Sequence, residues 1–146
     1  MDTRSDLIEK LRNREYRQAF VSSQINIGIP YQIRALRGEM RQEELAASTG
    51  MKQPRISAIE RPGYSSLNLT TLKRIAAAFD VALIVRFVPF SELVEWAENF
   101  SSDTFVVPAF KHDNKLFQGS ALSEVTANVE VEKKAERKAV ASIQPY

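Results

Sequence analysis

The stretch QEELAASTGMKQPRISAIER, residues 42–61, constrains the fold of this 146-residue chain more than any other stretch. It divides into two short helix-forming segments around Gly50, a residue that tolerates the positive φ of a tight turn. Ala46, four residues earlier, is small enough to let two helices approach each other at a steep angle. The stretch therefore predicts two helices, over about 42–48 and 53–61, that cross closely.

Apolar residues are spaced so that their side chains can pack together between these two helices. The predicted shared interior consists of Leu45, Met51, Ile56 and Ile59. Pro54 is compatible with the second helix because the amides of a first helical turn have no helical partner. Pro62 and Gly63 then end that helix.

Helical periodicity continues on both sides of this stretch. Residues 5–12 and 13–27 are predicted helices, the second capped by Asn13 and interrupted by Gly28. Pro30 suits the first turn of the next helix, whose apolar stripe is Ile29, Ile33, Leu36 and Met40. Downstream, Asn68 is the expected cap of a helix over 69–79, with one face formed by Leu69, Leu72, Ile75, Ala76 and Phe79.

The character of the chain changes at VALIVRFVPF, residues 81–90, which β-branched and aromatic residues mark as a strand. A single strand cannot satisfy its own backbone, so this one needs a partner. Either TFVVPAF at 104–110 or the same strand of a second copy fits that role. A short helix over 91–100, with Ser91 as its cap, lies between, and the polar residues from Lys111 on predict either mobility or a solvent-exposed helix.

Several classes of protein are disfavoured by composition. The chain has no cysteine, so disulfides and thiolate metal sites are excluded, and no metal-ligand cluster is present. His112 is the sole histidine and lacks a matching acid and nucleophile, while the five glycines form no phosphate loop. The charged amino terminus and the absence of an apolar run of about 18 residues argue against secretion and membrane insertion. We expect a cytoplasmic protein that is not an enzyme and has no cofactor.

The segment from about Ile29 to Val85 resembles the helix-turn-helix of the phage repressor and Cro family, also called the xenobiotic-response-element family. The resemblance lies in the spacing of Ala46 and Gly50, in the trailing Glu60 and in the helix that follows. It implies a mainly α fold: a repressor-like helix-turn-helix bundle with an N-terminal helical extension and a C-terminal strand and short helix. The expected segments are an extension at 1–28, the DNA-binding domain at 29–83, a strand and short helix at 84–110, and a polar, flexible tail at 111–146.

By this resemblance the second helix of the motif, 53–61, enters the major groove of double-stranded DNA with its amino end at the base edges. The residues placed at the bases are Gln53, Pro54, Arg55 and Ala58, where Arg55 could instead reach a phosphate. The expected phosphate contacts are Arg41, Gln42, Lys52, Ser57, Arg61, Tyr64, Ser65 and Asn68, where Asn68 could be only a cap and Tyr64 only a loop anchor. Residues 1–80 hold 13 Lys and Arg against 9 Asp and Glu, which fits a polyanionic partner.

Two details depart from the family pattern. Arg41 and Lys52 occupy helix-cap positions where the family usually has serine or threonine, which suggests that cap stability was exchanged for phosphate attraction. The linker RGEMR, residues 37–41, is about two residues shorter than usual, so either Arg34 or Arg37 could pair with Glu60, and we favour Arg37 slightly.

The functional expectation is a sequence-specific DNA-binding regulator, a repressor that controls its own gene. Two alternatives stay open: an antitoxin that binds both DNA and a toxin protein, and a protein-binding adaptor without DNA affinity. One such domain reads only a few base pairs, so we expect a homodimer, with residues 81–100 as the contact.

Overall fold

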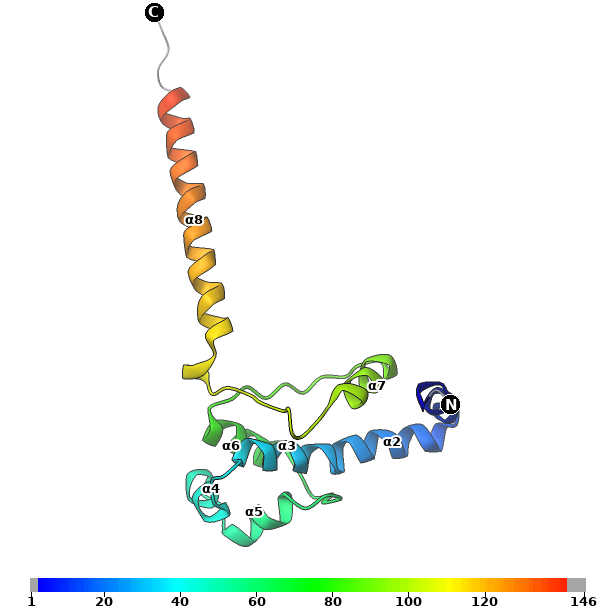
Figure 1. Ribbon diagram of the computed structural model, residues 1–146. Coiled ribbons are helices and arrows are strands. Elements are labelled where there is room, and N and C mark those ends of the chain that lie inside the picture. Colours follow the sequence, from blue (N-terminus) through cyan, green and yellow to red (C-terminus); the bar gives the residue numbers. More distant parts are fainter. Residues whose placement is uncertain (1–2, 142–146) are drawn as a thin grey trace, which may run out of the picture. The chain divides into compact units, whose positions relative to one another are not determined.

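The computed structural model describes residues 3–141, without the side chains of residues 119–130, 140 and 141. The chain divides after Val107 into two compact units. The helices of the first unit are α1 (Thr3–Leu11), α2 (Arg14–Asn26), α3 (Gly28–Arg37), α4 (Gln42–Thr49), α5 (Gln53–Ile59), α6 (Leu69–Phe79) and α7 (Phe90–Asn99) (Figure 1). The second unit contains a 3₁₀ turn, η1 (Phe110–His112), and a long helix, α8 (Asn114–Ala141).

The main hydrophobic core lies where α3, α4, α5 and α6 meet. Its buried side chains are Ile33, Leu45, Ala46, Ile56, Ile59 and Ile75. Partly buried residues surround it, among them Met51 from the predicted interior. Leu45, Ile56 and Ile59 are fully inaccessible to solvent, which confirms the interior predicted for the helix-turn-helix.

Several predicted helix ends are confirmed. The side chain of Asn13 accepts a hydrogen bond from the Tyr16 amide, and that of Asn68 accepts one from the Thr71 amide. Gly38 and Gly50 end α3 and α4, each with a positive φ. These ends keep α4 and α5 short and fix the point at which the chain turns between them.

The amino-terminal helices are joined to the helix-turn-helix in two ways. Ile27 both ends α2 and precedes α3, so the two helices follow one another almost directly (Figure 1). The Gly63 amide, in the loop after α5, donates a 2.8 Å hydrogen bond to the Asn26 carbonyl at the end of α2. On the opposite side, Arg4 of α1 pairs with Glu98 of α7 at 3.0 Å. Within the first unit, the described residues of the extension at 1–28 are therefore joined to the loop after α5 and to α7.

The strand predicted over residues 81–90 is wrong. The segment is extended, but no β-strand forms anywhere in residues 3–141, and the second candidate, 104–110, does not pair with it either. The physical reason is the lack of a partner: β-branched residues favour an extended backbone, whereas a strand needs a second backbone to bond with.

Three smaller expectations are also wrong. Ser91 does not cap α7, because the helix begins one residue earlier and Pro89 occupies the cap position. Met40 lies beyond the end of α3 and is 38% exposed, so it leaves the predicted stripe. Leu69, in the first turn of α6, is 54% exposed, whereas the neighbouring Thr71 is buried.

The second unit is mostly helix. α8 covers 114–141, and its described side chains at 114–118 and 131–139 are exposed. Of the two alternatives for the residues after Lys111, this segment takes the solvent-exposed helix. His112 is an exposed residue of η1.

Candidate nucleic-acid interface

A tight turn joins α4 to α5 and fixes their crossing. Gly50 has φ 66° and ψ 25°, the left-handed conformation that glycine adopts without strain. The Met51 amide donates to the Ala46 carbonyl at 3.0 Å, and the buried Thr49 hydroxyl donates to the Leu45 carbonyl at 2.8 Å. These hydrogen bonds satisfy carbonyl groups at the end of α4. The next helix, α5, starts at Gln53 on the outer side of the bundle (Figure 1).

A chain of hydrogen bonds runs from the buried side of α5 to its first residue. Arg37 donates to both carboxylate oxygens of Glu60, from Nε at 2.5 Å and from Nη2 at 2.9 Å. Gln42 Nε2 donates to Glu60 Oε2 at 3.0 Å. Gln53 Nε2 in turn donates to Gln42 Oε1 at 2.8 Å. This relay sets the orientation of the Gln53 amide in the free protein.

The charged end of the relay is buried. The side chain of Glu60 is 5% exposed and that of Arg37 is 16% exposed. The hydrogen bond to Glu60 is the main cause that raises the pKa of Arg37 above its ordinary value, and burial opposes it. Because an arginine pKa is already above about 12, the guanidinium stays charged at every pH of interest. The pair confirms the preference for Arg37 over Arg34.

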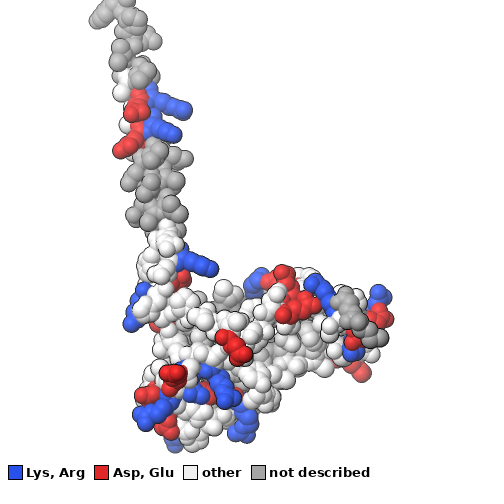
Figure 2. Space-filling model, in the orientation of Figure 1, with Lys and Arg blue, Asp and Glu red and all other residues white. Residues whose placement is uncertain are grey.

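Predicted phosphate contacts come together beside this relay. Gln42, Ser57 and Arg61 line one open recess of about 310 Å³, together with Arg34, Arg37, Glu60 and Pro62. Arg34 and Arg61 are exposed, and both bring positive charge to it. In Figure 2, Lys and Arg side chains gather over the end of the first unit that holds α4 and α5, next to a few acidic groups. The recess thus has the charge and the donors that a phosphate needs.

The two basic cap residues occupy the positions expected of them. Arg41 precedes α4 and Lys52 precedes α5, and both are exposed. Neither can accept a hydrogen bond from the helix amides, as a serine would. At α4 the Glu44 carboxylate accepts a 2.7 Å hydrogen bond from the Arg41 amide, which satisfies one backbone donor.

The remaining base-contact candidates lie on the open face of α5. Pro54 and Arg55 are exposed, while Gln53 and Ala58 are half-buried. The Arg55 guanidinium donates to the Thr71 hydroxyl at 3.2 Å, so its tip lies toward the first turn of α6. None of the four side chains is sealed inside the unit, and all remain candidates for DNA contact.

The loop between α5 and α6 holds three predicted phosphate contacts, Tyr64, Ser65 and Asn68, whose surroundings differ. Tyr64 packs partly against the core, and the Asn68 side chain is used as a cap. These positions fit the structural alternatives given for both residues. Ser65 is exposed, and its role stays a prediction.

Sequence reasoning missed three residues of this surface. Arg34 was considered only as a partner for Glu60, and Thr71 only as part of a helix. A Cβ atom at Gly50 would lie 3.4 Å from Arg74 Nη2, so Arg74 reaches from α6 to the turn. Arg34 and Arg74 are exposed arginines on the helices that flank the motif, and that position was the available signal.

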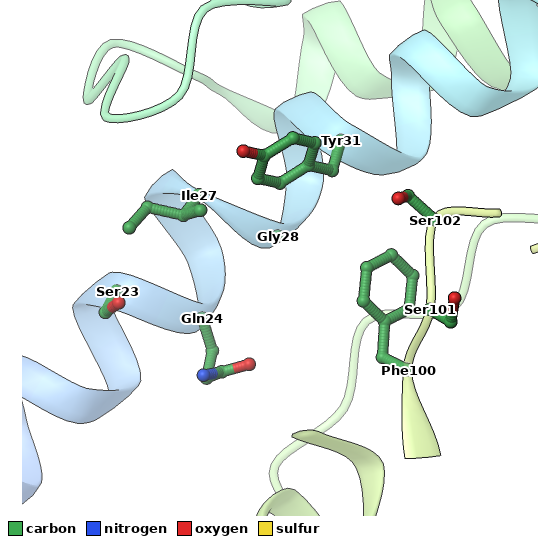
Figure 3. Close-up of a pocket in the computed structure, with 8 residues that line it drawn as sticks. All are labelled: Ser23, Gln24, Ile27, Gly28, Tyr31, Phe100, Ser101 and Ser102. Atoms are coloured by element: carbon green, nitrogen blue, oxygen red, sulfur yellow. The ribbon is translucent and has the colours of Figure 1, made fainter. Parts of the chain in front are cut away.

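A second recess, of about 370 Å³, lies apart from α4 and α5. It is lined by Ser23, Gln24, Ile27, Gly28, Tyr31, Phe100, Ser101 and Ser102 (Figure 3). Tyr31 and Phe100 lie on opposite sides of it, and none of its lining residues is charged. It lacks the cations that a nucleic acid would require.

Comparison with known families identifies the domain that carries the first surface. Residues 31–85 match the helix-turn-helix family model. Residues 31–85 thus carry a helix-turn-helix domain of the Cro/C1 type, and the match indicates DNA binding. Neither the search of curated proteins nor that of solved structures found a match to the chain.

No helix among the described residues has the length and apolar character to cross a bilayer. They contain no group of three or more His, Cys, Asp or Glu side chains placed to hold a metal ion.

Proposed function

We propose that the protein is a sequence-specific DNA-binding transcriptional regulator, a repressor that binds as a homodimer to a palindromic operator and controls its own gene. The observation that carries the proposal is the relay from Arg37 through Glu60 and Gln42 to Gln53. It orients a glutamine amide at the amino end of α5, on a surface rimmed by exposed cations.

Gln53 has the free groups that adenine readout needs. Its Nε2 uses one hydrogen on Gln42, which leaves a second donor, and its Oε1 accepts no hydrogen bond from the described residues. A glutamine in the major groove can accept from adenine N6 and donate to N7. Because the relay already holds the side chain, less side-chain entropy is lost when it binds a base.

The other contacts complete this binding mode. The Pro54 ring and the Ala58 methyl group would meet thymine methyls. Arg41, Gln42, Lys52, Ser57 and Arg61 would hold the phosphates, joined by Arg34, which lines the same recess as Arg61. The hydrogen bond of Arg55 to Thr71 draws the guanidinium toward the first turn of α6, which favours a backbone contact for this residue.

Binding of the purified protein to DNA from the promoter of its own gene tests the proposal. We expect a footprint with two symmetric halves about one helical turn, roughly 34 Å, apart. Gln53→Ala is expected to weaken binding by about 1–3 kcal/mol and to relax discrimination at an adenine of each half-site. Gln18→Ala, at an exposed glutamine of α2, is the matched control and should leave the affinity unchanged.

The salt dependence of binding separates the proposal from the protein-binding adaptor. A regulator that contacts phosphates loses affinity linearly on a log–log plot against salt, with a slope of about −0.9 for each phosphate neutralised. Arg61→Ala should make this slope shallower by about one. An affinity for DNA that is absent or independent of salt would favour the adaptor. The antitoxin alternative predicts in addition a toxic protein that co-purifies with the chain.

A further inference from the structure

Two open recesses adjoin each other in the first unit, near the point where α2 meets α3. One is the recess of about 370 Å³ described above, and we call it the ring recess because Tyr31 and Phe100 lie on opposite sides of it (Figure 3). The other has a volume of about 320 Å³, and we call it the charged recess. It is lined by Tyr31, Arg34, Ala35, Ser102 and Asp103. Tyr31 and Ser102 line both recesses, so one ligand has room to extend from the first into the second.

The ring recess has the lining of a site for a planar ring. Tyr31 and Phe100 present aromatic surfaces from two elements, and aromatic rings prefer to meet in offset-stacked or edge-to-face arrangements. Its polar side chains are hydroxyl and amide groups without charge. Those of Ser23 and Gln24 form no hydrogen bond with another described residue, so they are free to bind polar atoms of a ligand.

The charged recess holds one cationic and one anionic side chain that do not pair with each other. The Arg34 guanidinium has no ion pair or hydrogen bond within the part of the chain that the structure describes. The Asp103 carboxylate accepts one long hydrogen bond, from the Ser102 hydroxyl at 3.4 Å, which leaves most of its acceptor positions free. Arginine binds a carboxylate through two parallel donors, and a carboxylate accepts from an ammonium group. The recess is therefore complementary to a zwitterion.

We propose that the two recesses together bind an aromatic amino acid. Its ring would lie between Tyr31 and Phe100, its carboxylate would contact Arg34, and its ammonium group would contact Asp103. In such a ligand the two charges lie on one carbon, next to the group that carries the ring. This arrangement matches a charged recess that shares a wall with a ring recess. A polyanion would fit less well, because it would meet the Asp103 carboxylate.

Arg34 links this ligand site to the predicted DNA-facing surface. It lines the charged recess and also the recess that holds the predicted phosphate contacts Gln42, Ser57 and Arg61. A guanidinium that binds a carboxylate with two donors in the charged recess is no longer available to a phosphate in the other. The amino acid and DNA would thus compete for Arg34, and each would weaken the binding of the other by the same factor. This competition rests on the proposed function, whereas the binding of the amino acid does not.

Trp96 gives a direct readout of the ring recess. It is the one tryptophan of the sequence, and its ring stacks on that of Phe100 with centroids 5.7 Å apart. Phenylalanine is a suitable probe because it does not fluoresce at the wavelengths of tryptophan. Phenylalanine up to about 1 mM, the range of ordinary metabolite concentrations, should change the Trp96 emission of the full chain to saturation without DNA. Calorimetric titration measures the same binding independently of the fluorophore.

Three analogues test the class of ligand. Phenylethylamine lacks the carboxylate, 3-phenylpropionate lacks the ammonium group, and alanine lacks the ring. Each should bind at least about tenfold more weakly than phenylalanine, because each leaves one part of the site without its partner. Asp103→Asn should weaken the binding of phenylalanine but not that of 3-phenylpropionate, which has no ammonium group to lose.

Gly28 allows the ring recess to be filled without a clash in the protein. It lines the recess, and a Cβ atom added there would meet nothing within 4 Å. Gly28→Leu should abolish the binding of phenylalanine without lowering the melting temperature. Ser22→Leu adds the same side chain at an exposed position of α2 that does not line the recess, so it is the matched control and should bind phenylalanine as the wild type does.

Fluorescence anisotropy with labelled promoter DNA tests the competition. Saturating phenylalanine should weaken DNA binding by at least about fivefold, the lower end of ordinary coupling between two sites. The same addition should have no effect on Gly28→Leu or on Arg34→Ala, which lacks the shared guanidinium.

The ligand site and the competition are contradicted by different results. A wild type that does not bind phenylalanine, an analogue that binds equally well, or a Gly28→Leu variant with unchanged affinity would overturn the ligand site. Phenylalanine that binds but leaves DNA affinity unchanged, or raises it, would overturn the competition for Arg34. A protein that binds phenylalanine but no promoter DNA would keep the ligand site and overturn the proposed function.

Discussion

The surface of α4 and α5 and the extended segment between α6 and α7, residues 82–88, differ in how many of their polar groups have hydrogen-bond partners. On the first surface the buried carboxylate of Glu60 has three donors from two residues, and the Gln53 amide already has one partner. In the extended segment at 82–88, seven consecutive backbone units have no hydrogen-bond partner in the described residues, and Phe87 is fully exposed. The comparison teaches that the first surface is preorganised by its own hydrogen bonds, whereas the second has no hydrogen bond of this kind among the described residues.

Removal of the Arg37 side chain should cause the largest loss of stability. Arg37→Ala leaves the buried Glu60 carboxylate without its counter-charge, and breaking a buried pair in this way costs about 3–5 kcal/mol. Thermal denaturation of the purified variant measures this cost. Arg34→Ala, one turn earlier on α3 and exposed, is the control and should change stability by less than about 0.5 kcal/mol. Equal losses of stability in the two variants would contradict the idea that the relay preorganises the surface of α4 and α5.

A matched pair of isoleucines compares the two regions directly. Ile56 is inaccessible to solvent, and Ile56→Ala should cost about 2–5 kcal/mol in the free energy of unfolding. Ile84 is 77% exposed, so Ile84→Ala should leave the stability of the monomer nearly unchanged while it weakens dimerisation. Chemical denaturation and sedimentation measure the two properties separately. A large loss of monomer stability in Ile84→Ala would show that one chain already uses this side chain.

A substitution in the turn between α4 and α5 should cause a smaller loss of stability. Gly50→Ala forces a Cβ into a left-handed conformation at φ 66°, which costs about 1–2 kcal/mol. Gly28→Ala is the control, because a Cβ there meets nothing within 4 Å and lies at the start of α3. Thermal melts should show a loss for the first variant and no loss for the second. If Gly50→Ala were neutral, the tight turn would not be what fixes the position of α5.

Replacement of the basic cap residues should give the smallest change in stability. It should raise stability and lower DNA affinity. Arg41→Ser and Lys52→Ser each introduce a hydroxyl that can accept a bond from the first helical turn, with a gain of about 0.5–2 kcal/mol. The same changes remove a positive charge from the DNA-facing side, so affinity at moderate salt should fall. Melting curves and fluorescence anisotropy measure the two properties. Unchanged DNA affinity, or a lower melting temperature, would contradict the exchange of cap stability for phosphate attraction.

The helix-turn-helix was predictable from the sequence because its constraints are local. Ala46, Gly50 and the apolar residues on either side of them determine a turn and a crossing within about twenty residues. The caps at Asn13 and Asn68 bond only three residues ahead. The pairing of Arg37 with Glu60 spans 23 residues. It was predictable as one of two choices, since Arg34 and Arg37 lie on the same helix, one turn apart.

The strand could not be predicted correctly because its formation depends on a second backbone. Residues 81–90 have the composition of a strand, and the chain does extend there, but extension and pairing are separate conditions. The relay to Gln53 was also beyond sequence reasoning. Periodicity places Gln42 and Gln53 at the starts of their helices, whereas their 2.8 Å contact depends on the crossing of those helices.

The bond between the Gly63 amide and the Asn26 carbonyl makes the end of α2 and the exit from α5 neighbours in space. At the other end of this group of helices, Arg4 of α1 reaches Glu98 of α7. The amino-terminal helices are therefore anchored at two distant points, by an ion pair to α7 and by a backbone hydrogen bond to the loop that follows α5.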